Sequence, residues 1–372
     1  MNTTRRLAAI SLLTCASFSP AHAATFCVST GTQLANALVT SNSNGANDEI
    51  KIVSGTLTGS SQVATNPRWR ILPEASDEAS TLIVSGGWST GNNCSTQTQQ
   101  ADLTVLDAAF EGAALDIRHA TPTFSGQITI RNLTLTRGRS YSSGAASGLN
   151  ARIVGSLGAQ LIIENVFVVA AQTTVSQSGG VSINVDSGGF VRFRNNTVHS
   201  NTFTAQQAGS AVSISATAPA VAYVSNNSIF DNTSTIRAGS GLALAGVINA
   251  TNNAVADNTS TDVSPLQEVY SYDATSMTLR NNHFESAHLL NPFLESGTTD
   301  GDPLWTGVGM VRIPDAVSPL RNSGINSPSG GIPAIDIRGD ARIVSGTIDR
   351  GAVEAVAVAV PLTDAIFSNG FN

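Results

Sequence analysis

Charged side chains are scarce in this sequence. Only 12% of its 372 residues are Asp, Glu, Lys or Arg, about half of what an ordinary soluble domain carries. Lys51 is the only lysine, no run of basic residues occurs, and the formal net charge is −7. These features argue against nucleic acid and anionic membrane surfaces as partners. Small and β-branched residues take the place of the charges, which excludes a charged disordered chain and favours an all-β protein.

The sequence also lacks an apolar run long enough to span a bilayer. Residues 1–23 instead predict a secretory signal peptide, with a basic start, an apolar segment from Leu7 to Cys15 and a small-x-small cleavage site at Ala21-His22-Ala23. Leu12 to Cys15 loosely resembles a lipobox, which would make Cys15 a lipidation site. Thr14 fits poorly just before that cysteine, so we expect cleavage after Ala23.

Residues typical of metal sites and hydrolytic centres are few. The mature chain has four histidines, His119, His199, His283 and His288, and contains neither His-x-x-His nor Cys-x-x-Cys. Because zinc needs three or four convergent ligands, no such site is predicted. The motif G-x-S-x-G does not occur in a strand-turn-helix context. The adjacent acid pair, Gly-His-Gly and Arg-Ile-Lys of polygalacturonases are absent. The sequence therefore points to no resident cofactor and to no particular reaction.

Two cysteines, Cys27 and Cys94, remain after removal of the signal. In an oxidising compartment they are expected to form a disulfide. Two buried free thiols are the alternative, since spacing alone does not establish a bridge.

The strongest pattern is a repeat in which an asparagine stands between two short apolar stretches. The stretches Ile128–Leu135, Leu161–Val168 and Val191–Val198 illustrate it. Six asparagines share one register, at steps of 33, 30, 31, 26 and 29 residues: Asn132, Asn165, Asn195, Asn226, Asn252 and Asn281. A period of this length indicates a solenoid. Asparagine tolerates a left-handed bend, and stacked amides can hydrogen-bond along a column, so we interpret these residues as a structural ladder.

A second column of small and alternating apolar residues is offset from the asparagines, as at Gly180–Ile183 and Gly241–Leu244. Each unit therefore predicts three short strands and three turns, which form one coil of a right-handed parallel β-helix. Thr32–Thr40 places Leu34 and Leu38 at helical spacing, with Thr30 or Thr32 as a cap. This short helix is expected to cover the open N-terminal end of the solenoid.

The repeat endings Val198–Asn201, Ile229–Asn232 and Val255–Asn258 resemble the repeats of bacterial right-handed β-helix surface proteins, including polymorphic outer-membrane protein repeats. Valine or isoleucine stands where those repeats usually have phenylalanine. The order Asp302-Pro303-Leu304-Trp305, Ser318-Pro319-Leu320 and Asp349–Glu354 is similar to the choice-of-anchor Q domain, although Asn322 and Arg350 depart from its pattern. In this segment Arg342 is expected to pair with Asp336 or Asp349, or all three to be unpaired surface charges.

These patterns divide the chain into five parts. They are a signal peptide (1–23), an N-terminal cap with irregular first coils (24–110), regular coils (111–299), a closing unit (300–354) and a tail (355–372). The tail ends in D-A-I-F-S-N-G-F-N, which resembles a sorting end of secreted Gram-negative proteins; a frayed terminus is the alternative. The resemblances imply secretion or display at the outer membrane of a Gram-negative bacterium.

Asp231 and Asp257 are the candidate catalytic acids, because their register stacks them on consecutive coils about 5 Å apart, near the spacing of a retaining glycosidase. The same pair, with Asn232 and Asn258, could instead bind Ca²⁺, or the two acids are simply solvated turn residues. Arg131, Glu164 and Arg194 share another register and predict an outward charge ladder rather than a substrate-binding stripe.

Two functions are compatible with this sequence. The first is a non-catalytic, adhesin-like binding or structural protein whose Ser, Thr and Asn rows meet an extracellular glycan or a protein of a host or cell surface. The second is a carbohydrate-active enzyme, a polysaccharide lyase or glycoside hydrolase, that uses one flank of the β-helix. Fold alone does not choose between them.

Overall fold

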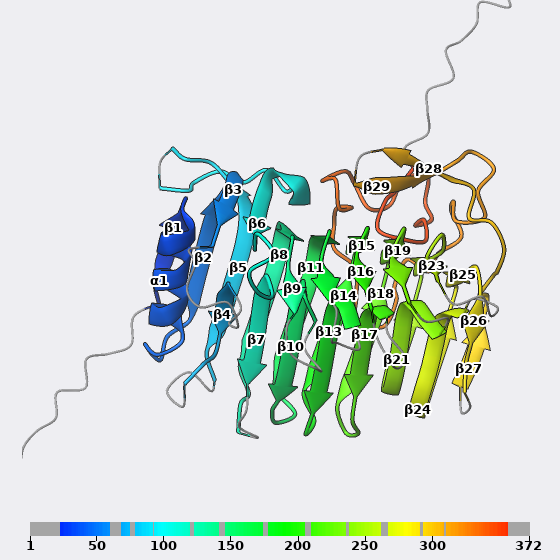
Figure 1. Ribbon diagram of the computed structural model, residues 1–372, viewed down its shortest axis with the longest axis horizontal. Coiled ribbons are helices and arrows are strands. Elements are labelled where there is room, and N and C mark those ends of the chain that lie inside the picture. Colours follow the sequence, from blue (N-terminus) through cyan, green and yellow to red (C-terminus); the bar gives the residue numbers. More distant parts are fainter. Residues whose placement is uncertain are drawn as a thin grey trace, which may run out of the picture.

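The computed structural model is a parallel β-solenoid with one α-helix at its N-terminal end, which confirms the predicted β-helix (Figure 1). The structure describes residues 23–59, 68–74, 79–91, 93–119, 123–140, 146–173, 178–204, 210–235, 238–261, 267–290, 293–308 and 310–355. Cys15, the rest of the predicted signal peptide up to residue 22, and the tail after residue 355 lie outside these residues.

Each regular coil has four strands rather than the three expected from the sequence. We call the faces that they build sheets I to IV, in the order in which the chain passes through them. Sheet I comprises β4 (Trp69–Ile71), β7 (Leu115–His119), β10 (Leu149–Val154), β13 (Ser178–Asp186), β17 (Ser210–Ala216), the first halves of β21 (Ala238–Thr251) and β24 (Gln267–Arg280), and β26 (Ala287–His288).

Sheet II follows sheet I along the chain and includes the N-terminal strands. It comprises β1 (Thr25–Val28), β2 (Asp48–Val53), β5 (Thr81–Trp88), the first halves of β8 (Gln127–Thr136) and β11 (Gln160–Val169), β14 (Phe190–Arg194), β18 (Val221–Ser225), the second halves of β21 and β24, and β27 (Phe293–Ser296).

Sheets III and IV complete the coil. Sheet III comprises β3 (Gly55–Thr58), β6 (Thr104–Asp107), the second halves of β8 and β11, β15 (Thr197–His199), β19 (Ser228–Phe230), β22 (Ala254–Val255) and β25 (His283–Phe284). Sheet IV comprises five two-residue strands, β9 (Arg139–Ser140), β12 (Gln172–Thr173), β16 (Thr202–Phe203), β20 (Thr233–Ser234) and β23 (Thr259–Ser260). Strands this short leave little alternation to read in a sequence.

The pairing of these strands is parallel and nearly in register, so equivalent residues of successive coils lie one strand spacing of about 4.8 Å apart. Inward positions form fully buried apolar columns, such as Ile130, Ile163, Phe193, Val224 and Leu279 on sheet II. Outward positions carry the variable side chains, and any recognition surface must be sought there.

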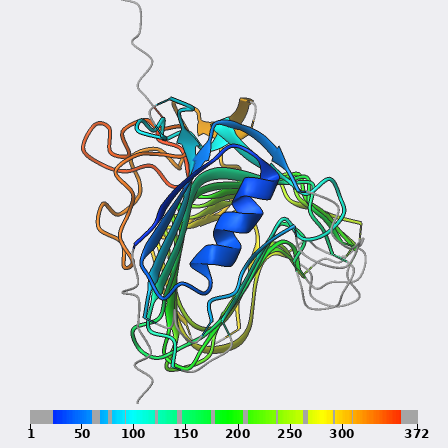
Figure 2. The same ribbon diagram turned by 90° about the vertical axis from the view of Figure 1, so that its left-hand side faces the viewer.

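The predicted capping helix is α1 (Gly31–Ser41), and it begins at the N-cap Thr30 with a capping box to Gln33. Its buried face consists of Leu34, Ala37, Leu38 and Ser41. Figure 2 shows the helix lying across the open end of the coils, where it covers apolar side chains that an uncapped solenoid would expose.

After the last coil the chain turns back along the side of the solenoid. An antiparallel hairpin, β28 (Trp305–Val308) and β29 (Val311–Pro314), lies beside β15 and β19, and a mostly irregular segment continues to Ala355 (Figure 1). We call residues 302–355 the strap, because they contact coils from the 3₁₀ turn at Ala101–Leu103 to β25.

Candidate functional site

The six asparagines of the predicted ladder occupy the bend between sheets II and III. All six have left-handed backbones, with φ between +48° and +59°. Their amides bond along the column only at its start, where Asn165 Nδ2 donates to Asn132 Oδ1 at 3.1 Å and Asn195 Nδ2 donates to Asn165 Oδ1. The backbone conformation explains the residue type, since asparagine adopts this region at low cost.

From Asn195 onward the same column binds the strap instead. Asn195 Nδ2 also donates to Ile335 O at 3.2 Å, and Asn281 Nδ2 donates to Ser323 O at 2.9 Å. Asn252 makes a reciprocal pair with the backbone of Ile325, at 2.9 and 2.8 Å. Amide–amide hydrogen bonds therefore do not run through all six residues, and the later asparagines bind the backbone of the strap.

A continuous ladder does exist one residue further along the chain. Asn196, Asn227, Asn253 and Asn282 are fully buried, and each of the first three donates its Nδ2 to the Oδ1 of the next, at 2.8 to 3.1 Å. Each amide also bonds the backbone of neighbouring coils, as Asn227 Nδ2 does with Phe193 O. The repeated Asn-Asn pair was the sequence signal for this ladder.

A third ladder lies at the bend between sheets III and IV and ends on an acid. Asn201 Nδ2 donates to Asn232 Oδ1, and Asn232 Nδ2 donates to Asn258 Oδ1, at 2.9 and 2.8 Å. The backbone N–H of Asn258 then donates to Glu268 Oε1 at 2.6 Å. Glu268 is fully buried, and this burial, together with the nearby Glu285 and Asp257, raises the pKa of its carboxyl to about 8. Glu268 therefore remains neutral at pH 7 and takes the place of an amide.

The candidate acids Asp231 and Asp257 do lie on consecutive coils, where the backbone N–H of Asp231 donates to Asp257 O. Both have left-handed backbones, in the same bend position as Arg137, Ala170 and Ser200. Their carboxylates, however, are held separately by the strap: Asp231 pairs with Arg312, and Asp257 accepts a hydrogen bond from Trp305 Nε1 at 2.7 Å.

The alternative calcium site lacks its amide ligands. Asn232 and Asn258 are buried in the third ladder, and their Oδ1 atoms already accept hydrogen bonds there. Within the described ranges, no three His, Cys, Asp or Glu side chains converge in a way that could hold a metal ion.

An aromatic stack under the hairpin explains why the strap covers these acids. The rings of His199 and Phe230 stack at 5.1 Å, Trp305 meets Phe230 edge-on at 5.6 Å, and the Arg312 guanidinium lies 5.0 Å from the Phe230 ring centre. Burial and, to a smaller extent, the nearby Arg312 lower the pKa of His199 to about 4, so the imidazole is neutral. This arrangement anchors the hairpin to sheet III through apolar and cation–π contacts.

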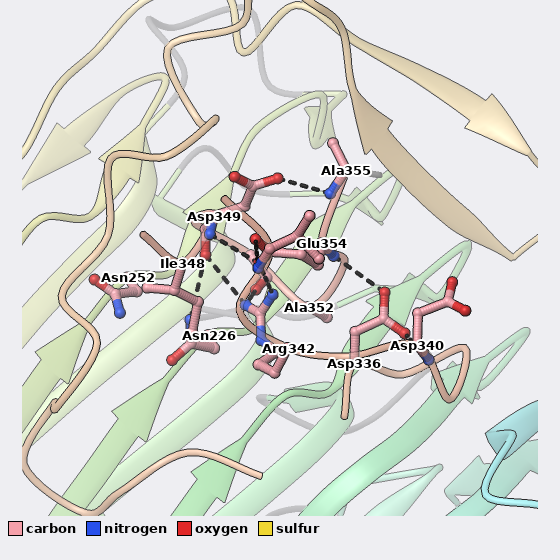
Figure 3. Close-up of polar contacts among 12 residues, drawn as sticks. Asn226, Asn252, Asp336, Asp340, Arg342, Ile348, Asp349, Ala352, Glu354 and Ala355 are labelled. Carbon is pink, nitrogen blue, oxygen red and sulfur yellow. Dashed lines mark hydrogen bonds and ion pairs between the residues drawn. The ribbon is translucent and has the colours of Figure 1, made fainter. Parts of the chain in front are cut away.

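The end of the strap is fixed by a buried polar cluster (Figure 3). Arg342 Nη1 pairs with Glu354 Oε2 at 3.0 Å, and its Nη2 donates to the carbonyls of Asp349 and Gly351. Burial raises the pKa of Glu354 to about 7. The expected pairing of Arg342 with Asp336 or Asp349 carboxylates is therefore wrong, as is the alternative of unpaired surface charges, because Asp336 pairs with Arg338 and the cluster is buried.

The predicted charge ladder on sheet II is partly formed. Arg131, Glu164 and Arg194 are paired positions on adjacent strands. Glu164 bonds Arg194 at 2.6 Å, and Arg194 Nη1 also donates to Gly330 O of the strap at 2.8 Å. The predicted disulfide is present between Cys27 and Cys94 and links β1 to the loop after β5.

The outer face of sheet I carries polar and aromatic side chains that belong neither to the asparagine ladders nor to the contacts of the strap. Its first strands carry Arg70, Asp116, Arg118 and Arg152, and its middle strands carry hydroxyl and amide groups. The hydroxyl and amide residues are Asn150, Ser182, Asn184, Ser213 and Ser215. We call this surface the sheet I face. Sequence reasoning missed it, because Arg70 precedes the regular repeats and the arginines follow no fixed step.

The far end of the sheet I face is aromatic. The ring of Tyr270 lies 6.3 Å from Tyr272 and 5.8 Å from His288, with planes inclined by only 17° and 9°. Tyr270 lies beside Ala243 of the preceding coil, and its side chain is partly exposed. The planes of the three rings are thus nearly parallel, and the rings form a stacked, partly exposed cluster.

Comparison with known proteins agrees with this architecture. Residues 123–300 match the family model described as "Right handed beta helix region". No curated protein sequence matches the chain. In the described part of the chain, no helix has the length and apolar character needed to cross a membrane. The sequence repeat, the stacked coils and the family match together identify the chain as a right-handed parallel β-helix repeat protein.

Proposed function

We propose that this chain is a secreted or surface-displayed, non-catalytic binding protein that recognises a glycan along the sheet I face. The observation that carries the proposal is the composition of this face: guanidinium groups, then rows of hydroxyls and amides, then the stacked rings of Tyr270, Tyr272 and His288. Sugars bind through hydrogen bonds to planar polar groups and through apolar contact with aromatic rings, and this face offers both.

The contacts of the candidate acids support binding over catalysis. Asp231 and Asp257 hold Arg312 and Trp305, so both carboxylates contribute to attachment of the strap. The resemblance of the strap to the choice-of-anchor Q domain and of the coils to polymorphic outer-membrane protein repeats supports display at a Gram-negative cell surface. We assign residues 1–23 to export and the tail from 355 to sorting on the same grounds.

The proposal is tested with mature protein, residues 24–372, on a panel of neutral and acidic polysaccharides. We expect binding to at least one glycan, and the double variant Y270A/Y272A should weaken it roughly tenfold. F190A is the matched control, because Phe190 is a partly buried aromatic residue on sheet II. No binding to any glycan, or equal losses in both variants, would overturn the proposal.

The competing function is a carbohydrate-active enzyme that uses Asp231 and Asp257. The same panel should be incubated with the protein and assayed for reducing and unsaturated ends. Release that disappears in D231N would establish catalysis. We expect no release, and we expect D231N to loosen the hairpin, because it removes the ion pair to Arg312.

A further inference from the structure

A buried carboxylate organises the arginine-rich end of the sheet I face. Asp116 is only 2% exposed and accepts hydrogen bonds from Arg70 Nε at 3.1 Å and from Asn150 Nδ2 at 2.7 Å. Arg118 Nε donates to Asp116 Oδ1 at 3.1 Å and forms an ion pair with Oδ2 at 2.9 Å. One acid therefore fixes the orientation of two guanidinium groups.

The two guanidinium groups keep their terminal nitrogens free. Their contacts to Asp116 use Nε, and no acceptor among the described residues meets the Nη groups of Arg70 or Arg118. The side chains are 39% and 51% exposed. Arg152 is exposed beside them and has no ion-pair partner within the same residues. Planar forks held in this way suit bidentate hydrogen bonding to an oxyanion.

Sheet stability does not account for this grouping. Arg118 and Arg152 are direct partners on adjacent parallel strands, and like charges in that position repel each other. On sheet II the equivalent pair is Glu164 and Arg194, with opposite charges that bond each other. In a chain with 19 basic residues in total, three arginines around one acid form a local excess of positive charge.

We propose that Arg70, Arg118 and Arg152 form an anion-binding site for the carboxylate or sulfate groups of an acidic glycan. The inference rests on the proposed function, because it names the ligand class for the sheet I face. Successive coils rise by about 4.8 Å, which is similar to the length that one sugar unit adds to an extended chain. Acid groups of consecutive sugars therefore meet arginines of consecutive strands.

Four polymers test the site: polygalacturonate, heparin, fully methyl-esterified polygalacturonate and dextran. The first two separate a carboxylate from a sulfate preference, and the esterified polymer removes only the charge. We expect binding to an acidic polymer that is at least tenfold tighter than binding to the esterified one and that weakens with added salt.

Variants at exposed positions test the residues themselves. R118Q and R152Q should each weaken acidic-polymer binding roughly tenfold. R280Q, which removes an exposed arginine of sheet II, should leave binding unchanged. D116N distinguishes two ways of binding an acidic polymer. The substitution removes a negative charge, so binding should become tighter if the arginines act only through their overall charge. Binding should become weaker if Asp116 is needed to hold Arg70 and Arg118 in place.

The outcomes separate this inference from the proposed function. Equal binding to charged and neutral polymers, or losses in Y270A/Y272A without losses in R118Q and R152Q, would overturn the anion site and leave glycan binding intact. Absence of binding to every glycan would overturn both. Folding of D116N is checked by circular dichroism. If D116N does not fold, R152Q alone tests whether the arginines bind the acidic polymer.

Discussion

Glu268 occupies a position that asparagines hold in the preceding coils, and this makes its protonation a determinant of stability. Its Oε1 accepts from Asn258 N, whereas its Oε2 is buried and has no hydrogen-bond partner among the residues that the structure describes. The pKa of Glu268 rises from 4.5 to about 8, chiefly because the carboxyl is buried. The folded protein therefore holds a proton that the unfolded chain releases between these two pH values. Stability conferred by this site is complete below about pH 4.5, falls as the pH rises, and is lost above about pH 8.

We predict that E268Q is more stable than the wild type at pH 7 to 8 by a few kcal/mol, on the order of the linkage free energy, and that the two converge near pH 4. Denaturant unfolding between pH 4 and pH 9 measures this difference. E295Q, at an exposed glutamate, serves as the control. Parallel pH profiles for wild type and E268Q would show that the buried carboxyl does not carry the effect.

Adjacent asparagines in one Asn-Asn pair have different roles, so their substitutions should differ. Asn227 makes four buried hydrogen bonds, to Asn196, Phe193 and Asn253. Within the described ranges, the side chain of Asn226 makes one long bond of 3.4 Å, to Asp349 O, and the residue has φ of +56°. We predict that N227A lowers the free energy of unfolding by about 3 kcal/mol or more, because it leaves buried groups unpaired.

N226G should change stability by less than about 1 kcal/mol, since glycine accepts the left-handed bend. Chemical denaturation of both variants provides the comparison. A similar loss in N226G and N227A would contradict the distinct roles of the two columns.

At the scale of elements, the coil could be predicted because the left-handed bend between sheets II and III favours asparagine in every coil. The asparagine register reveals the period, and the apolar positions around it reveal the strands. Sheet IV could not be predicted from the sequence, because its strands have only two residues each and show no alternating pattern. The position of the strap could not be predicted for another reason. The asparagines bind it largely through backbone carbonyls, such as those of Ser323 and Ile335, and every residue type has a backbone carbonyl.

The candidate site shows the same limit. Asp231 and Asp257 were placed correctly on neighbouring coils, but nothing near them in the sequence reveals Arg312 or Trp305, which are separated from them by 81 and 48 residues. The sheet I face depends on Arg70, a residue outside the regular repeat. Register along the solenoid can be read from a periodic sequence, whereas contacts made by the returning strap cannot.

The disulfide joins the first strands, where the coils are irregular, and its effect should be local. Cys94 is fully buried against Val53 and Trp88. We predict that C27S/C94S destabilises this end by about 2 to 4 kcal/mol. Hydrogen exchange should increase in β1, β2 and β5 and remain unchanged in β24. Reduced wild-type protein is the control and should behave like the variant; equal deprotection of β24 would contradict a local role.

For the molecule as a whole, the strap changes how a solenoid is expected to unfold. Coils that contact only their neighbours unfold in segments, because stability is a sum of local terms. Here residues far apart along the axis are joined by one segment: Ala101 N donates to Ile337 O, and Arg350 reaches the last coil. The strap thereby couples the coils that it contacts, and we expect the coils from β8 to β27 to unfold in a single transition.

Arg350 is the residue on which this coupling can be tested. The residue is 5% exposed, and its guanidinium donates to Asn282 O at 2.9 Å, Thr299 Oγ1 at 2.6 Å and Gly297 O at 3.1 Å. R350A should weaken attachment of the last coil by about 3 kcal/mol and split the transition, so that β24 to β27 lose hydrogen-exchange protection at lower denaturant than β8 to β14. R280Q removes an exposed arginine from the same coil and should retain one transition. If R350A keeps uniform protection, neighbouring coils alone hold the solenoid together; if it splits, the strap makes separate coils behave as one cooperative unit.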